Sequence, residues 1–467
     1  MITYQDLLEV SEYEQDRMDF CLKVINDHKQ SKDYKIAKDA EEYDKRQNVT
    51  IMNFRKLLYT VSGQAVPDNY SANYKLPSAF FPRFVTQQNQ YLLGNGVFFT
   101  DDDGKNDETI KLKLGKDFDT RLQECGRAAL VEKVAFGFWN YDHMEVFKFT
   151  EFAPLFDEEN GSLKAGIRFW QIDADKPLRF TLYEEDGYTE YIKRTDKTEV
   201  LKEKQYYQII RSGDAVDRLN GTEIIEGENY PGFPIVPLWA NPHRQSELVG
   251  IREQIDCYDL IKSGFANDLD DAAAIYWVIK NAGGMDDIDL AQFVERIKTV
   301  KATAIDSEGG ASAEAHTTNV PYQARQVYLE QLRADLYEDF QIVNVAALTS
   351  GQRTATEINA SYQPMDNKVD QYEYCVLDFL DSIMKLAGIE ATPIFKRSRI
   401  VNQLEETQMV LAAADYLDTE TVLKHIPWLA QDEIEGIVQR KIAEQTAMMT
   451  QMVPTTEETA EEAEEEE

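Results

Sequence analysis

The chain has 467 residues and a mass of 53.6 kDa, which is long enough for about three domains and a sizeable core. Acidic residues outnumber basic residues 84 to 49, so the net charge is −35, and aromatic residues make up 11%. The aromatic content excludes a disordered chain. The acidity disfavours simple electrostatic binding of nucleic acid, because phosphate backbones attract lysine and arginine clusters.

Several further classes are disfavoured by missing patterns. No run approaches 18 apolar residues, and the first residues lack a signal peptide's basic and apolar regions, so we expect no membrane partner and no secretion. The four cysteines form no CxxC pair, which predicts reduced thiols: Cys21, Cys125, Cys257 and Cys375. The sequence has no phosphate loop, HExxH or GxSxG motif, so we predict no catalytic residue, cofactor or metal site.

The first half of the chain changes from helices to strands. Helical spacing predicts helices within residues 5–63, at 80–93 and at 119–135. Short runs rich in Val, Ile and aromatic residues, separated by turn clusters, then predict a β-meander. These runs are Gly137–Trp139, Glu145–Phe149, Ile167–Trp170, Leu178–Tyr183, Thr189–Ile192 and Tyr206–Ile210.

Two helical rods follow, with a small insertion between them. Apolar residues step by three or four from Leu248 to Leu269, and the helical stretch that begins at Ser246 predicts a rod of about 26 residues. We expect strands at 274–280 and 300–305, a helix at 290–298, and a loop at 308–318. A second rod begins at Tyr322, with Leu329, Leu332, Leu336 and Phe340 on one face.

A short segment of small and polar residues, 344–353, precedes the longest periodic stretch, which begins at Thr354. Pro364 lies inside this stretch and predicts a kink near Ala360–Ser361, because proline removes a backbone hydrogen bond. Three more helices are expected at 400–416, 420–425 and 432–445. The acidic tail that follows is expected to be disordered.

This order of elements, together with local sequence, resembles the portal proteins of tailed double-stranded DNA bacteriophages, in particular the siphophage portal group of Gram-positive hosts. The resemblance covers about residues 50–445. Its segments are Asn73-Tyr74-Lys75-Leu76 with Tyr91-Leu92-Leu93-Gly94, Ser246-Glu247-Leu248 with Ile255–Asp259 and Phe265–Leu269, Thr349-Ser350-Gly351, and Thr419–Leu423 with Ile426-Pro427 and Asp432–Glu435.

The resemblance implies an α+β portal fold with an α/β wing, a two-helix stem, a small α/β clip, a long kinked helix and a helical crown. The implied divisions are an N-terminal and wing domain at 1–245, stem helix one at 246–272, the clip at 273–321, stem helix two at 322–342, a tunnel loop at 343–353, the long wing helix at 354–390, the crown at 391–447, and a disordered acidic tail at 448–467.

The implied function is a ring-shaped channel, of twelve subunits, at one vertex of the capsid of the virion. Double-stranded DNA passes through it during packaging and ejection, and assembly takes place in the host cytoplasm. Implied partners are the large terminase, the major capsid and scaffolding proteins, and a head-completion adaptor. The family hydrolyses nothing, so the chain is not expected to be an enzyme. An acidic helical scaffold protein without a DNA channel is the alternative, and an enzyme without a known motif is a more remote one.

Two sets of site residues follow from the resemblance. The tunnel loop would present Asn344, Ala346, Ala347, Thr349, Ser350, Gly351, Gln352 and Arg353 to the channel. Arg353 could contact DNA phosphate or pair with Glu357 one turn later. The clip would present Asp286, Asp287, Asp289, Glu295 and Arg296. Its aspartates could face a partner or simply favour a helix N-terminus. The acidic tail could bind a partner or maintain solubility.

Overall fold

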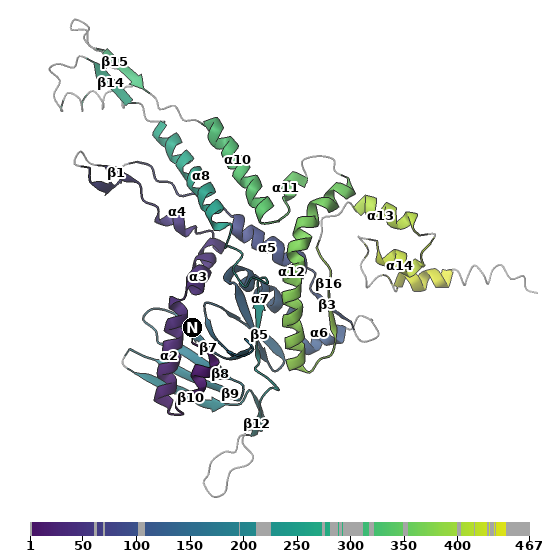
Figure 1. Cartoon of the computed structure of the whole chain (residues 1–467). Helices are drawn as coiled ribbons and strands as arrows, with labels where there is room; N and C mark the ends of the chain where they lie inside the picture. Colours follow the sequence, from purple (N-terminus) through teal and green to yellow (C-terminus); the bar gives the residue numbers. More distant parts are fainter. Residues whose placement is uncertain are drawn as a thin grey trace, which may run out of the picture. The chain divides into compact units, whose positions relative to one another are not determined.

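The computed structural model describes residues 2–59, 63–68, 71–100, 108–195, 197–211, 226–272, 276–280, 288, 292, 312–316, 322–348, 354–398, 403–414, 416–426, 429, 434 and 436–444. The chain divides into two compact units, residues 1–342 with 364–398 and residues 343–363 with 399–467. All the described strands belong to the first unit, and the described part of the second is helical (Figure 1). The mixed α+β class expected from the sequence is confirmed.

Four helices open the first unit: α1 (Tyr4–Leu8), α2 (Glu14–Gln30), α3 (Lys32–Asp44) and α4 (Val49–Asn53). Ser31 separates α2 from α3, because its side chain caps α3 by accepting a hydrogen bond from the Tyr34 N–H at 3.1 Å. The expected helix does not continue to residue 63. Instead, β1 (Leu57–Tyr59) and β2 (Ala65–Pro67) form a small antiparallel pair.

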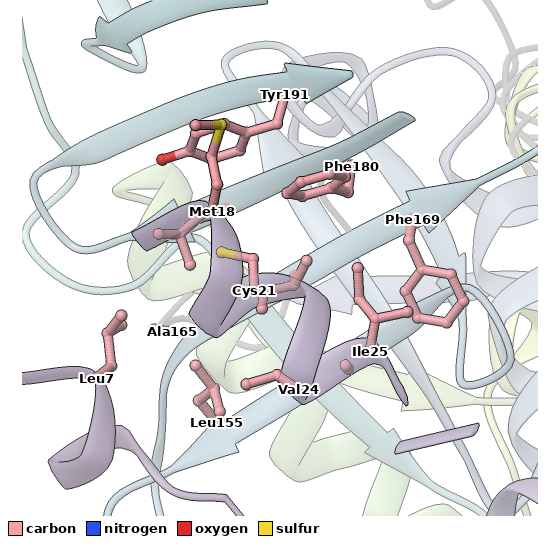
Figure 2. Close-up of a cluster of buried hydrophobic side chains, with 13 residues drawn as sticks. Leu7, Met18, Cys21, Val24, Ile25, Leu155, Ala165, Phe169, Phe180 and Tyr191 are labelled. Atoms are coloured by element: carbon pink, nitrogen blue, oxygen red, sulfur yellow. The ribbon is translucent and has the colours of Figure 1, made fainter. Parts of the chain in front are cut away.

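A five-stranded antiparallel sheet provides the first core. In the order β10-β9-β8-β7-β6, its strands are Thr198–Gln205, Gly187–Lys193, Leu178–Glu184, Leu163–Trp170 and Phe152–Phe156. Helix α2 packs on one face, because Met18, Cys21 and Ile25 recur at helical spacing and are buried there (Figure 2). On the sheet side, Phe180 and Tyr191 contribute to this core, and their stacked ring centroids lie 5.1 Å apart.

A three-stranded sheet, ordered β13-β4-β5, lies next to the first. Its strands are β13 (Ile235–Trp239), β4 (Val134–Asn140) and β5 (His143–Lys148). A buried aromatic cluster joins the two sheets, and Phe136 of β4 lies 4.6 Å from Phe152 of β6 between ring centroids. The two sheets therefore share one core.

Helices α7 (Phe118–Glu132) and α12 (Ala355–Ala387) pack closely on this core. A Cβ on Gly137 of β4 would lie 2.5 Å from the Phe379 ring of α12, and a Cβ on Gly126 of α7 would lie 2.2 Å from the Tyr372 hydroxyl. Glycine at both positions therefore allows α12 to approach. The apolar stripe predicted for this helix is buried from Met365 to Ile383.

The first unit also contains α5 (Phe80–Leu93), α6 (Glu108–Leu114), the pair β11 (Gln208–Arg211) with β12 (Glu226–Glu228), and the pair β3 (Val97–Thr100) with β16 (Thr392–Phe395). Helix α5 has the predicted bounds. The sequence pattern does not predict β6, β10 or β16. Strand β6 contains Pro154, and β10 is rich in charged residues, so β6 and β10 do not have a composition typical of strands.

The two rods are α8 (Arg252–Ala272) and α10 (Tyr322–Asp339), and both were predicted. Between them, β14 (Tyr276–Lys280) pairs antiparallel with β15 (Ser312–His316). The loop expected at 308–318 is therefore wrong over β15, where pairing outweighs the low strand preference of Ser-Ala-Glu-Ala-His. The helix at 290–298 and the strand at 300–305 lie outside the described residues, apart from Gln292, which is helical.

The second unit contains α11 (Val345–Leu348), the start of α12, α13 (Gln403–Ala412), α14 (Thr419–Lys424) and a helical stretch at 436–444. Asp418 caps α14 by accepting the Thr421 N–H at 2.9 Å. The acidic tail lies outside the described residues. Among the helices that the structure describes, none combines the length and apolar character that a bilayer span requires.

Candidate functional site

Helices α8 and α10 lie side by side and run antiparallel (Figure 1). Gln254 of α8 hydrogen-bonds Asp339 at the end of α10, and Asp268 near the other end of α8 pairs with Arg325 near the start of α10. The pair carries ten acidic and four basic residues. Its surface is therefore strongly acidic.

The two rods leave large apolar side chains uncovered. The exposed fractions are 66% for Val327, 56% for Tyr322 and 53% for Leu269. A cleft of about 420 Å³ lies between the rods and is lined by Leu260, Ile261, Gly264, Ala324, Arg325 and Tyr328. Farther along α10, Leu332, Leu336 and Phe340 are buried within the chain, as the predicted stripe requires. Only the early part of that helix therefore lacks apolar cover.

The buried face of α8 is partly polar. Asp259, Ser263 and Asn267, spaced by four residues, accept hydrogen bonds from the backbone N–H groups of Ser78, Leu76 and Tyr74 at 2.8, 3.0 and 2.6 Å. An extended chain advances about 6.6 Å in two residues and a helix about 6 Å in four, so the two spacings match. We call these three side chains the polar ladder. It fixes the extended segment 74–78 along the rod.

The polar ladder continues into the N-terminal helices. Asn48, which caps α4, donates from its amide to Asp259 at 2.9 Å, and Thr50 donates to Asp256 at 2.7 Å. Burial raises the pKa of Asp259, because the charged carboxylate loses water, although the Asn48 and Ser78 hydrogen bonds oppose this. The start of α8 is thus tied to the body of the first unit.

The candidate channel segment is the predicted tunnel loop, residues 343–353, which lies between α10 and α12. The flanking elements are held together, because Lys368 of α12 donates to the Phe340 carbonyl at the end of α10 at 3.2 Å and pairs with Glu247 at 2.7 Å. Gln341 ends α10 in a left-handed conformation, with φ of 59°. Residues 343–363 belong to the second unit, and the residues on both sides of them therefore have fixed positions within the first unit.

The structure describes three of the predicted tunnel-loop residues. Instead of a loop, α11 forms at Val345–Leu348, and the Asn344 carbonyl accepts the N–H groups of Ala347 and Leu348 at 3.0 and 3.2 Å. Ala346 and Ala347 are exposed on this helical turn. The remaining predicted residues lie outside the described part of the chain: Thr349, Ser350, Gly351, Gln352 and Arg353.

The start of α12 is capped by its own residues. Glu357 accepts the Thr354 N–H at 3.1 Å, and the Thr354 hydroxyl accepts the Glu357 N–H at 3.3 Å. Pro364 lies within the continuous helix, and the boundary between the two compact units falls immediately before it. The kink expected near Ala360–Ser361 stays a prediction.

The predicted clip surface cannot be placed, since Asp286, Asp287, Asp289, Glu295 and Arg296 lie outside the described residues. In the part that is described, no group of three or more His, Cys, Asp or Glu side chains could hold a metal ion. The four cysteines form no disulfide with one another.

Sequence reasoning missed the polar ladder and the Lys368–Glu247 pair. The sequence does contain a pattern for the ladder, because Asp259, Ser263 and Asn267 recur every four residues. They continue the helix face that begins with Ile251 and Ile255. Lys368 has no such signal, because one lysine on a mixed helix does not indicate its partner.

Comparison with known proteins gives consistent results. The family model for phage portal proteins of the SPP1 Gp6-like type matches residues 22–451. The portal protein of Clostridium phage phiCD119 is 24% identical over 398 residues, which cover 78% of this chain and 83% of that protein. The portal protein of Bacillus phage SPP1 is 23% identical over 411 residues, which cover 82% and 78%.

Two solved structures are distantly similar, each at 10% identity. One is the neck of an empty gene transfer agent particle, computed with C6 symmetry. The match covers 74% of this chain and 88% of the matched chain, with a TM-score of 0.44. The match to the virion of the native gene transfer agent particle covers 73% of this chain and 88% of the matched chain, with a TM-score of 0.40. Both likenesses are too distant to add to the assignment.

The class of protein is therefore a structural component of a phage virion rather than an enzyme. The chain belongs to the SPP1 Gp6-like family of phage portal proteins, whose model matches most of its length. Its function is that of the portal, the channel at the capsid vertex through which DNA is translocated. The recognition made from the sequence is confirmed.

Proposed function

We propose that twelve copies of the chain form the portal ring, with α8 and α10 as its stem and residues 273–321 as its clip. Residues 1–245 form the wing together with the long helix at 354–390, and residues 391–447 form the crown. The exposed apolar surface of the rods carries this proposal, because Val327, Tyr322 and Leu269 remain uncovered within one subunit. A neighbouring subunit in a closed ring covers such a surface through a heterologous contact.

Residues 343–353 line the narrowest part of the channel in this proposal. Support comes from their position between a rod and the longest helix, and from their small or neutral polar side chains. Ala346 and Ala347 allow several copies to approach one axis. The acidic rods repel phosphate, so DNA slides past them without adhering.

The partners follow from the same arrangement. The large terminase and later the head-completion adaptor dock on the clip through Asp286, Asp287, Asp289, Glu295 and Arg296. The major capsid and scaffolding proteins contact the wing. Support for the clip assignment comes from the chain order, because β14 and β15 directly follow α8 and precede α10.

Ala347→Trp tests the channel assignment. The substitution places one indole per subunit near the axis, so DNA packaging should fall at least tenfold while the ring still assembles. Ala174→Trp is the matched control, because Ala174 is also exposed but lies in the turn between β7 and β8. Packaging at the parental rate, or failure of the Ala347→Trp ring to form, contradicts the assignment of this segment to the channel.

A further inference from the structure

A basic recess lies where α3, α5 and α7 meet in the first unit. It has a volume of about 550 Å³, and its lining residues include Arg46, Arg83 and Arg127 together with Asp44. Arg127 pairs with Asp44 and donates to the Thr86 hydroxyl at 2.7 Å. Arg83 donates to the Tyr337 hydroxyl at 3.0 Å. Three arginines around one recess contrast with a chain whose net charge is −35.

Arg46 occupies a backbone position that favours glycine. The Arg46 N–H bonds to the Tyr43 carbonyl at 3.0 Å and the Gln47 N–H to the Glu42 carbonyl at 2.8 Å, which is the Schellman ending of α3. Arg46 takes the left-handed conformation of this motif, with φ of 63°. A non-glycine residue is strained there, and such strain concentrates at functional positions.

The Arg46 side chain is exposed at the recess, and its guanidinium has no hydrogen-bond or ion-pair partner among the residues that the structure describes. The other two arginines are held in place by protein contacts, so they form a fixed wall. Gln87 and Gln90 add amide groups to the lining. The recess therefore combines a preorganised cationic wall with one available guanidinium.

The charge of the recess indicates the ligand. Three guanidinium groups and the single Asp44 carboxylate sum to +2, which matches a doubly charged phosphate or two neighbouring phosphates of a DNA strand. A single phosphate dianion carries this charge on one group, whereas an acidic peptide would need two separate carboxylates to supply it. Arginine also suits phosphate through its planar set of donors. We infer that the recess formed by Arg46, Arg83 and Arg127 is a phosphate-binding site.

Arg46→Gly gives a clean test, because glycine is the residue that the turn prefers and the fold is expected to be kept. With the full-length protein, we would measure binding of a labelled 20-base-pair duplex between 50 and 200 mM KCl. Loss of one phosphate contact should lower the slope of log affinity against log salt by about 0.9. Arg46→Lys should restore the slope because it restores the charge.

Arg121→Gln is the matched control, since Arg121 is an exposed arginine of α7 that pairs with Glu124 at 2.9 Å outside the recess. A second arm compares thermal unfolding in inorganic phosphate and in chloride at equal ionic strength. A lower DNA salt slope for Arg46→Gly alone identifies backbone phosphate as the ligand. Equal slopes, with phosphate stabilising the parent but not Arg46→Gly, identify free phosphate.

The inference is overturned if Arg46→Gly and Arg121→Gln behave alike in both arms. It is also overturned if a polyglutamate peptide, but neither phosphate nor DNA, distinguishes Arg46→Gly from the parent. Neither result bears on the ring, because the recess lies within one subunit and ring formation is measured separately by mass.

Discussion

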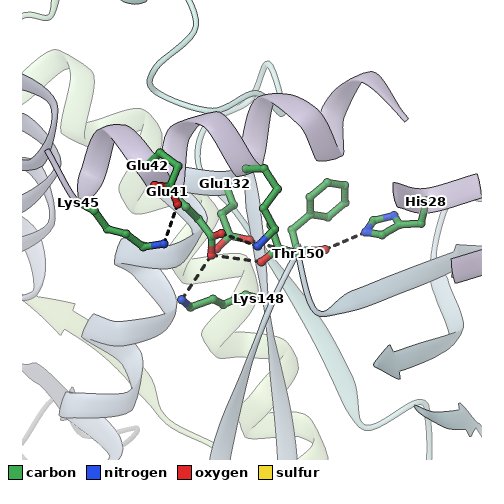
Figure 3. A network of polar contacts seen from close by, with 9 residues as sticks. His28, Glu41, Glu42, Lys45, Glu132, Lys148 and Thr150 are labelled. Carbon is green, nitrogen blue, oxygen red and sulfur yellow. Dashed lines mark hydrogen bonds and ion pairs between the residues drawn. The ribbon is translucent and has the colours of Figure 1, made fainter. Parts of the chain in front are cut away.

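Glu132 and Glu41 are two carboxylates that both bind Thr150 inside the first unit (Figure 3). Glu132 accepts the Thr150 N–H at 2.9 Å and is only 2% exposed. Burial, together with the nearby Glu41 charge, raises the pKa of Glu132 to about 8. Burial also acts to raise the pKa of Glu41, but Lys38, at 2.7 Å, and Lys148 lower it. The pair therefore holds one proton near neutral pH, on Glu132.

The variant Glu132→Gln tests whether Glu132 carries this proton. A folded-state pKa above the unfolded value stabilises the protein at low pH, and this contribution is lost as pH rises from about 4.5 through about 8. Glutamine mimics the neutral acid, so the variant should match the parent near pH 4 and exceed it in unfolding free energy near pH 8.5. The difference should grow by at most about 1.4 kcal/mol per pH unit.

Urea unfolding at several pH values measures this difference. His28 lies nearby, and burial lowers its pKa to about 4, so it adds a loss of stability as pH falls below about 6.5. Both proteins carry His28, so its effect cancels in the comparison. A difference between variant and parent that does not change with pH would contradict the assignment of the proton to Glu132.

At the scale of elements, the polar ladder should make a large contribution to the attachment of α8. Asp259 is fully buried and accepts hydrogen bonds from Ser78 and Asn48, so Asp259→Ala leaves two donors unpaired. We expect a loss of about 2–4 kcal/mol in unfolding free energy, because each unpaired buried donor costs about 1–3 kcal/mol. Asp270→Ala on the exposed side of the same helix should change it by less than about 0.5 kcal/mol. Similar losses for the two variants would show that the ladder is not a major attachment.

One edge strand of each main sheet, β13 in the three-stranded sheet and β6 in the five-stranded sheet, carries a proline at an outward-facing backbone position. The Ala240 N–H bonds to the Lys133 carbonyl, so alternate residues of β13 face β4 and Pro237 faces away. The Phe169 N–H bonds to the Glu151 carbonyl, which places Pro154 of β6 in the same way. Proline offers no N–H there, so an additional strand cannot pair along the edge.

Pro237→Val restores the outward N–H of β13 and should increase self-association beyond the native assembly. Light scattering at 37 °C should rise several-fold faster for this variant than for the parent. Val236→Ala is the control, because residue 236 faces β4 and already pairs with Gly137. No difference between Pro237→Val and parent would mean that another feature protects this edge.

The rods, α5, α7 and the long helix were predictable from sequence, because each carries apolar residues at helical spacing, although part of this stripe stays exposed on the rods. Strands β6, β10, β15 and β16 were not, since they depend on partners that local composition does not reveal. Strand β16, for example, pairs with β3 nearly 300 residues earlier. The assignment of residues 343–353 to the channel is an expectation from chain order, whereas α11 and the Lys368 contact to Phe340 required the three-dimensional structure.

At the scale of the whole molecule, the acidity fits a channel that must release its DNA. A net charge of −35 repels the phosphate backbone over most of the surface, so any adhesion must be local. The sequence also has no phosphate loop with a lysine. Purified protein with ATP and Mg²⁺ should therefore release phosphate at the background rate. Turnover that survives repurification and disappears in a point mutant would contradict the non-enzymatic assignment.

The central claim is that the exposed apolar surface of α8 and α10 is covered by neighbouring subunits in a closed ring. Native mass measurement of the purified protein at micromolar concentration tests it most directly. We expect a particle close to twelve times the 53.6 kDa chain mass, with a central hole in images taken along its axis. A single species at the mass of one chain, with no larger particle, would contradict the account.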